Sequence, residues 1–443
     1  MAGFAKRPHR KHPDGHTEKS YEMPEDKDTE DIGSYIGTSY YDNDDDDDDT
    51  PDTRRTRSKK LVYDDDDDDY YDSRRPKKPN FFVRALHAIF PVKGDGIAES
   101  VRKIIFDVAV VAFVITGGSV VYSIIDEGNQ GNIDIKVAEI YKPIVQESES
   151  VEEVREKIKG ELNLTDSDLD KIEAEKPGIL PDFLGLYSQN RDIVGWVKLG
   201  SKTDPIVNIN YPVMQADDND YYLTHNFFRD ETQRGAIFAD YRNKFSFGEL
   251  SGNTILYGHN MWNGDTMFAK LSRYYTPNVM TDPDAYKKDP LLFYKEHPTV
   301  TFNTLYENAE WKVFACVLFN TQEELGEVYP YLNYRDFPNK ATFNAFILDI
   351  MDRSVLWTDV DLQYGDSILT LSTCHYPYGK EKADTRVAIF ARKVRDGESA
   401  EVDVSKAVRN PDPLKFAYQY RVEGGSWGGR KWDSSKLLSY KGE

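Results

Sequence analysis

The feature that most constrains this 443-residue chain is an apolar stretch from Ile104 to Ile125, whose only charged residue is Asp107 near its start. A helix of this length would span roughly 33 Å, which is enough to cross the hydrocarbon core of a bilayer. A buried core helix is the alternative, but the uncharged run from Val108 to Ile125 leaves no polar face. The stretch also lies too far from the amino terminus to be a cleaved signal peptide. We therefore expect one transmembrane helix over residues 104–125.

Charged residues on either side of this helix indicate its orientation. The preceding segment, residues 81–103, is aromatic and basic and includes Arg102 and Lys103, whereas Asp126 and Glu127 follow the helix. Because basic residues gather on the cytoplasmic side of membrane helices, we expect a single-pass protein of the cell membrane with a cytoplasmic amino terminus. Residues 126–443, and with them any catalytic domain, would then be extracellular.

Residues 1–80 are predicted to be a disordered, cytoplasmic, Asp-rich tail. Two acidic runs, Asp44–Asp49 and Asp64–Asp69, are each followed by a basic cluster, and aliphatic residues are few. Such charge density repels and cannot bury a core, so a solvated tail is expected, with a docking arm or a divalent-cation store as alternatives. The net charge of −21 and the pI near 4.9 leave no basic face for nucleic acid, so no nucleic-acid partner is expected.

Residues 126–178 have the pattern of a helical stalk. Apolar residues recur at helical spacing among many glutamates and lysines, and Thr165 with Asp168 resembles a capping box. Pro177 and Gly178 end this region.

From Ile179 the pattern changes to strands rich in Val, Ile, Phe, Tyr and Thr. Eight are predicted: Ile193–Leu199, Pro205–Gln215, Gly235–Asp240, Asn253–His259, Thr299–Tyr306, Glu310–Asn320, Asp366–Thr373 and Thr385–Lys393. Short helices are expected over Met267–Tyr275 and, between the sixth and seventh strands, over Ala341–Arg353. A mostly antiparallel sheet of eight strands is most easily closed as a barrel, so we predict a mostly β fold with the barrel over residues 179–400. Residues 401–443 form an extension of unassigned role, in which Trp427 and Trp432 could dock on the barrel.

The two cysteines have different settings. Cys316 lies inside a strand pattern and is expected to be an inert core residue, whereas Cys374 ends a strand beside turn-forming residues. Two cysteines cannot form a disulfide framework, and no Cys/His cluster has zinc spacing, so neither a metal nor another cofactor is expected. An extracellular region without evident disulfides fits a Gram-positive surface.

Cys374 could be a nucleophile if a nearby group favours its thiolate. His375 is adjacent in a strand and should face the opposite way, and His297 lies in an uninformative loop, while His225 stays possible. His259 ends a strand behind a glycine, so we expect it at a barrel mouth with Cys374. Arg386 begins the next strand, and its permanent charge can donate to an oxyanion. Each residue alone has an ordinary structural explanation, but together they suit acyl transfer through a thioester.

These residues resemble the motifs of a known family. The run from Thr370 to Cys374, followed by Arg386, resembles the sortase signature TLxTC…R, and the sequence from Tyr257 to Met261 resembles the sortase histidine motif. The similarity extends over roughly residues 180–395. Further segments resemble class B sortases in particular: Val194–Val197, Asn210–Gln215, Asp218–Leu223, Phe302–Tyr306 and the helix Ala341–Arg353.

The resemblance implies an eight-stranded sortase β-barrel with N-terminal helices and a cysteine transpeptidase activity. Such an enzyme cuts an LPxTG- or NPxTN-like sorting motif between Thr and Gly or Asn, then passes the acyl group to an amine of the peptidoglycan precursor. The implied roles are nucleophile for Cys374, general acid and base for His259, and oxyanion or substrate clamp for Arg386. Thr373, Ser372 and Asn219, which belong to the matching motifs, are assigned to substrate binding. The implied partners are surface proteins or pilins that carry a sorting signal.

Three alternatives stay open at this point. The chain could be a class B pilin polymerase, since some class B members build pili. It could instead be a surface cysteine protease that needs no amine, or a membrane-tethered scaffold with a degenerate site. The Asp282-Pro283-Asp284 run lies within the barrel sequence and lacks the aromatic residue of a class C lid, so it disfavours that class.

Overall fold

The computed structural model describes residues 80–141, 150–200, 208–261, 266–275 and 288–438. The chain divides into two units, Met1–Asp107 and Val108–Glu443. The predicted tail over residues 1–80 therefore lies almost wholly outside the described residues, as does the Asp282-Pro283-Asp284 run. The helices are α1 (Phe81–Ile89), α2 (Ile97–Ile140), α3 (Val151–Leu162), α4 (Asp166–Glu175), α5 (Pro181–Gln189), α7 (Leu292–Glu296), α8 (Lys340–Arg353) and α9 (Ala417–Glu423).

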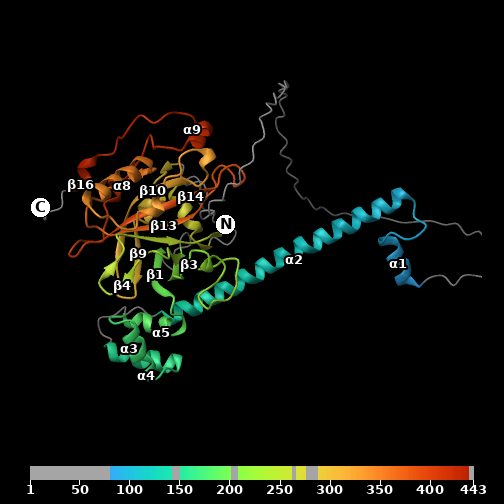
Figure 1. Ribbon diagram of the computed structural model, residues 1–443, viewed down its shortest axis with the longest axis horizontal. Coiled ribbons are helices and arrows are strands. Elements are labelled where there is room, and N and C mark those ends of the chain that lie inside the picture. Colours follow the sequence, from blue (N-terminus) through green and yellow to red (C-terminus); the bar gives the residue numbers. More distant parts are fainter. Residues whose placement is uncertain (1–79, 142–149, 201–207, 262–265, 276–287, 439–443) are drawn as a thin grey trace, which may run out of the picture. The chain divides into compact units, whose positions relative to one another are not determined.

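The second unit is built around a closed barrel, and its strands are those predicted from the sequence (Figure 1). They are β1 (Ile193–Gly200), β2 (Asn208–Met214), β3 (Ile237–Ala239), β6 (Asn253–Tyr257), β9 (Thr299–Thr304), β10 (Glu310–Asn320), β13 (Ile368–Cys374) and β14 (Thr385–Lys393). Their order around the barrel is β1-β2-β3-β6-β13-β14-β10-β9. Neighbours are antiparallel except β2 with β3 and β6 with β13, so the prediction of a mostly antiparallel barrel is confirmed.

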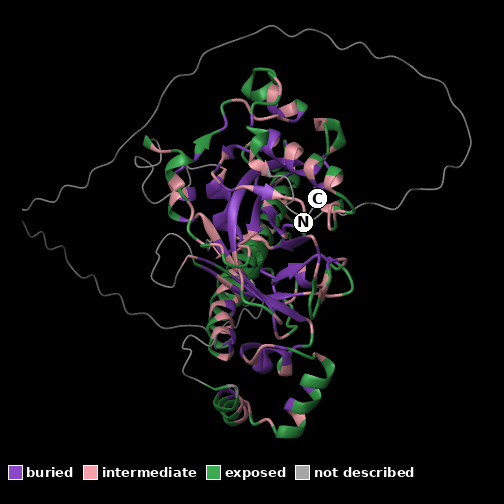
Figure 2. Ribbon diagram, turned by 90° about the vertical axis from the view of Figure 1, so that its left-hand side faces the viewer, coloured by how far each residue is buried: buried purple, intermediate pink, exposed green. Residues whose placement is uncertain are grey.

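Alternate residues of every barrel strand meet in one interior core. On β13 these are Leu369 and Leu371, and on β14 they are Val387 and Ile389, because successive side chains point to opposite faces of a sheet. A register shift in β10 brings Cys316 into the same core. Cys316 is free and fully buried, and burial raises the pKa of its thiol, which confirms the predicted core position. Figure 2 shows the contrast between the buried strands and the largely exposed helices α3 and α4.

The stalk helices pack against the outer face of β1, β2, β3 and β6 through a second core. The capping box predicted at Thr165 and Asp168 starts α4, and a similar box at Ser150 starts α3. Tyr141, just beyond α2, stacks on Trp196 of β1 with ring centroids 4.2 Å apart. Helix α5 was not predicted, since the sequence was expected to change to strands at Ile179. Its residues from Asp182 to Tyr187 are all buried, so the segment has no polar face that would reveal a helical period.

The outer face of β10, β13 and β14 is covered by α8, which matches the predicted helix, and by the C-terminal extension. Strand β15 (Val408–Arg409) pairs with β11 (Leu356–Trp357), and β16 (Leu437–Leu438) pairs with β12 (Leu362–Gln363). Trp432 is buried and Arg430 binds Asp352 of α8 at 2.7 Å. The extension is therefore part of the fold, and Trp432 docks as proposed from the sequence. Trp427 remains 37% exposed.

Helix α2 contains the predicted apolar stretch and continues beyond it to Ile140. Among the described residues it is the one helix long and apolar enough to cross a membrane. The segment predicted as a helix over Met267–Tyr275 forms a 3₁₀ helix, η2 (Ala269–Tyr274), preceded by the short strands β7 (Asn260–Met261) and β8 (Thr266–Met267). The β7–β8 pair directly follows His259, so it bears on the site described next.

Candidate active site

The three residues singled out by the sequence form a row at the ends of three neighbouring strands, with His259 two residues past the end of β6. Cys374 pairs with Arg386 across β13 and β14. On the other side of β13, Ser372 pairs with Tyr257 at the end of the parallel strand β6. The contact continues past β6, because Gly258 donates to the Ser372 carbonyl at 3.3 Å and Asn260 donates to the Cys374 carbonyl at 2.6 Å, and His259 lies between these two residues. Strand pairing and these two hydrogen bonds therefore bring a thiol, an imidazole and a guanidinium together from distant parts of the sequence.

This row lies at the ends of the strands, but on the outer side of the barrel rather than inside its mouth. Leu371 and Val387 point into the core, so the alternating residues Cys374 and Arg386 point outward. On the same outer face, Ser372 shares a 2.8 Å hydrogen bond with the hydroxyl of Tyr331. The Cys374 side chain is free and partly exposed, whereas the rest of β13 is buried.

Gly258 explains how His259 joins this outer face. A Cβ at Gly258 would lie 2.4 Å from Cδ1 of Ile237 and 2.9 Å from the ring of Phe268, which are both core residues. The backbone of Gly258 therefore packs directly against the interior core, and the side chain of His259 points to the outer face. The ring of His259 is fixed by a 2.8 Å hydrogen bond between Nε2 and the Leu223 carbonyl. Because a carbonyl only accepts, Nε2 carries the proton and Nδ1 is left as the acceptor nitrogen of the neutral ring.

Burial and charge set the protonation of the two partners of Cys374. Burial lowers the pKa of His259, and the Arg386 guanidinium lowers it further, so the imidazole is held neutral at physiological pH. Burial also disfavours the charge on Arg386, but the Cys374 and Asp384 side chains outweigh it and raise the pKa of Arg386. The guanidinium binds the Asp384 carboxylate at 2.5 Å and the Thr385 carbonyl at 3.0 Å, which fix its position on β14.

Two residues beside the thiol were missed from the sequence. Burial, followed by a hydrogen bond with Cys374, raises the pKa of the Tyr376 phenol, so the phenol stays protonated next to the sulfur. Asn260 donates from Nδ2 to the Cys374 carbonyl at 2.6 Å, so the residue after His259 is bonded to the backbone of Cys374. Their only sequence signal was position, since Asn260 lies within the histidine motif and Tyr376 lies two residues after Cys374.

The residues assigned to substrate binding have internal hydrogen bonds. Thr373 is buried and donates to the Gly258 carbonyl at 2.7 Å, which strengthens the junction between β6 and β13. Ser372 bonds to Tyr331, as described above. Asn219 is buried, donates to Asp240 at 3.3 Å and accepts from the backbone of Tyr241 at 3.0 Å. Their assignment to substrate binding stays a prediction.

The other histidines considered in the sequence lie in different settings. His375 is buried against Tyr275, with ring centroids 5.7 Å apart, and burial lowers its pKa to about 4. His225 stacks on Tyr221 and its Nδ1 lies 2.8 Å from the carbonyl of that residue. His297 packs against Phe293 behind the interior core. Within the described ranges, no group of His, Cys, Asp and Glu side chains could hold a metal ion.

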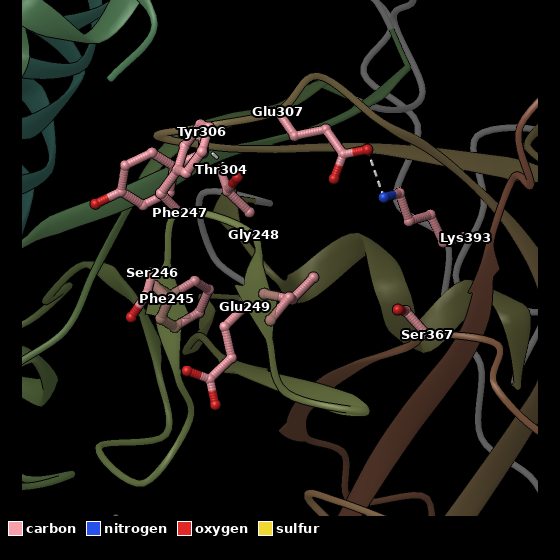
Figure 3. A pocket seen from close by; sticks show the side chains of 11 residues that line it. Phe245, Ser246, Phe247, Gly248, Glu249, Thr304, Tyr306, Glu307, Ser367 and Lys393 are labelled. Atoms are coloured by element: carbon pink, nitrogen blue, oxygen red, sulfur yellow. Dashed lines mark hydrogen bonds and ion pairs between the residues drawn. The ribbon is translucent and has the colours of Figure 1, made fainter. Parts of the chain in front are cut away.

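A cavity of about 550 Å³ lies at the other end of the barrel strands (Figure 3). Phe247 and Tyr306 meet edge to face at its rim, and Lys393 forms an ion pair with Glu307. Ser367 precedes β13, so this end is separated from Cys374 by the length of that strand, about 20 Å. The cavity is therefore distinct from the row around Cys374.

Comparison with known proteins agrees with the architecture and the motifs. The sortase domain family matches residues 205–394. Sortase B of Listeria monocytogenes is 34% identical over 197 residues, which cover 44% of this chain and 68% of that protein. The chain belongs to the sortase family, class B. Sortase B of Staphylococcus aureus is 32% identical over 220 residues, covering 49% of this chain and 76% of that protein.

A solved structure of a Staphylococcus aureus sortase B–substrate complex is also similar, at 29% identity. The match covers 56% of this chain and 99% of that one, with a TM-score of 0.40. Sortases are cysteine transpeptidases, so this sortase is an enzyme of acyl transfer rather than a scaffold. The C-terminal extension over residues 401–443 lies outside the matched sortase domain.

Proposed function

We propose that Cys374 is the nucleophile of this sortase, His259 its general acid and base, and Arg386 its oxyanion clamp. The Cys374 thiol gives its proton to His259, and the resulting thiolate attacks the carbonyl carbon of the scissile peptide bond. The C–N bond then breaks, His259 returns the proton to the leaving amine, and a thioester remains on Cys374. An incoming amine attacks this thioester, loses its proton to His259 and releases the thiolate.

The observation that carries this proposal is the pairing of Cys374 with Arg386 on the outer side of β13 and β14, with His259 just past the end of the neighbouring strand β6 and its neighbour Asn260 bonded to the Cys374 carbonyl. A row on an outer face is reachable by an extended polypeptide, which an interior row is not. The lowered pKa of His259 keeps a neutral ring able to accept a proton, while Arg386 supplies a permanent charge where the oxyanion develops.

We further infer that the substrate is a surface protein with a C-terminal LPxTG- or NPxTN-like sorting motif, cut between Thr and Gly or Asn. The acceptor is an amine of the peptidoglycan precursor. The apolar part of α2 supports an anchor in the cell membrane, with the amino terminus in the cytoplasm and the barrel outside. Such an anchor would hold the active site close to nascent cell wall.

Mass spectrometry of the full-length enzyme in detergent, incubated with sorting peptides and with or without an amine, tests the proposal. We expect a thioester on the wild-type chain, and a peptide–amine product that depends on the amine. Cys374→Ala should abolish both species, whereas Cys316→Ala should retain them, because Cys316 is buried in the core. Cleavage that survives in Cys374→Ala would refute the assignment of the nucleophile. Cleavage that never yields an amine adduct would indicate a protease.

A further inference from the structure

The part of α2 that follows the apolar stretch binds the segments on both sides of His259. Three of its side chains, Asp126, Gln130 and Asp134, are spaced by four residues and therefore share one face of the helix. Figure 1 shows this end of α2 reaching the barrel. Farther along the same helix, Val137 is buried in the core beneath the barrel, so the polar face continues into an apolar anchor.

The first segment held by α2 is the loop over residues 221–236, which begins with the 3₁₀ helix η1 (Tyr221–Leu223). Asp126 accepts from the Thr232 hydroxyl at 2.8 Å and from the Gln233 backbone at 3.2 Å. Gln130 accepts from the Asn226 amide at 3.2 Å. The contacts are therefore distributed along the loop.

The loop's strongest attachment to α2 is the side chain of Arg234. It is only 3% exposed, forms an ion pair with Asp134, and lies 3.7 Å from Glu127. Burial raises the pKa of Asp134 and Arg234 opposes that rise, so the two groups depend on each other. Removing Asp134 would leave the Arg234 guanidinium with little access to water, which is strongly unfavourable.

These contacts lead directly to His259. The two arms of the loop are joined by hydrogen bonds from Thr232 to Thr224 at 2.8 Å and from Ala236 to Tyr222 at 3.0 Å. Leu223 lies between these two bonded positions, and its carbonyl is the acceptor for His259. If the part of the loop that contains Arg234 moves, the Leu223 carbonyl oxygen, which binds the His259 ring, therefore moves with it.

The second segment held by α2 is the β7–β8 pair, which follows His259. Glu127 accepts from the Thr266 hydroxyl at 3.1 Å, and the backbone of Phe268, two residues later, donates to the His259 carbonyl at 3.0 Å. One turn of α2 thus contacts both the loop that binds the imidazole and the hairpin that binds the backbone of the same residue.

We propose that residues 126–134 of α2 are a positioning element for His259. Arg234 is the positioning residue through which this element acts on the loop that binds the imidazole. The element fixes the ring through the Leu223 carbonyl, so the rate of the proton-transfer steps depends on how the helix leaving the membrane segment contacts the barrel. This inference rests on the proposed role of His259 in acyl transfer, but its structural part can be measured without any substrate.

The test compares Arg234→Gln with Arg234→Lys in the full-length enzyme in detergent. The control is Arg155→Gln, which removes a more exposed arginine–carboxylate ion pair, with Glu173 in the stalk helices, away from the loop. We expect Arg234→Gln to lower kcat for the sorting peptide about tenfold while KM changes less than about twofold. Arg234→Lys keeps the charge opposite Asp134 and should recover most of kcat, and Arg155→Gln should leave kcat unchanged.

The second readout is the tautomer of His259, measured from the ring nitrogen resonances of histidine-labelled protein and assigned by comparison with His259→Gln. The wild type should show a single Nε2-protonated ring, and Arg234→Gln should lose it, while Arg155→Gln should not. An unchanged tautomer and kcat in Arg234→Gln would overturn the inference. If the wild type transfers no peptide yet the tautomer responds to Arg234→Gln, the proposed function fails while the positioning role stands.

Discussion

Replacing Gly258 by alanine should damage both the stability and the rate of this sortase. The new Cβ would lie 2.4 Å from Ile237 Cδ1 and 2.9 Å from two ring atoms of Phe268, where ordinary contacts begin near 3.4 Å. Ile237 and Phe268 are 1% and 0% exposed, so neither can move into solvent. A shift of roughly 1 Å must therefore be taken up by the backbone that leads into His259.

The expected magnitudes follow from this overlap. Overpacking of a filled core costs about 1–3 kcal/mol of the free energy of unfolding, and a domain of this size loses about 2–4 °C in Tm for each kcal/mol. A misplacement of about 1 Å in a catalytic group can cost about 100-fold in rate. We therefore expect Gly258→Ala to lower Tm by several degrees and kcat far more than stability alone would explain.

Circular dichroism melting and peptide-cleavage kinetics on the full-length chain measure the two effects. Gly160→Ala is the matched control, because Gly160 lies in α3 with no atom within 4 Å of the added Cβ. Alanine in a helix stabilises by roughly 0.5–1 kcal/mol relative to glycine, so this control should raise Tm slightly and leave kcat unchanged. The steric reasoning is refuted if Gly258→Ala matches the wild type in both Tm and kcat.

Three further perturbations test other parts of the structure. Asp384→Asn should lower kcat about tenfold with Tm little changed, because Arg386 loses its ionic anchor; cleavage kinetics decide, and an unaltered kcat would exclude this role. His375 has a folded-state pKa of about 4 against about 6.5 unfolded, so stability should fall by up to about 3 kcal/mol as pH drops from 6.5 to 4. Urea unfolding at several pH values should show that His375→Gln lacks this loss of stability between pH 6.5 and 4. If the free energy of unfolding falls with pH equally in both proteins, the buried, neutral state of His375 is contradicted. Trp432→Ala should cost about 3 kcal/mol in the same assay, whereas Trp427→Ala, at a half-exposed position, should cost well under 1 kcal/mol; equal losses would mean that the extension is not anchored by Trp432.

The sequence sufficed to predict the barrel because each strand is a separate run of β-branched and aromatic residues between turn signals. It also sufficed to place Cys374 at the end of one strand and Arg386 near the start of the next, where the two pair. It could not predict the face of the sheet on which they lie. In β13 every residue from Ile368 to Thr373 is buried, because α8 covers the outer face, so the usual alternation of polar and apolar residues is absent.

Other features of the site could not be predicted because the groups involved have no distinctive pattern in the sequence. The partner of His259 is the backbone carbonyl of Leu223, and a carbonyl has no side-chain signature. The contact between Arg234 and Asp134 joins residues 100 positions apart, and each looks like an ordinary surface charge in the sequence. Tyr376 follows the signature by two residues, within a turn, where position alone does not indicate which way a side chain points.

The row around Cys374 also has a consequence for the order of folding. The strand on one side of the cysteine comes from about 115 residues upstream, and the strand on the other side is the last of the barrel in the sequence. Pairings of such long range close late, because the chain must first lose the entropy of a long loop. A nascent or partly folded chain can therefore pair Cys374 with Arg386, which lies on the next strand, before His259 reaches the site. If His259 activates this thiol as proposed, its reactivity would report that β6 has paired with β13.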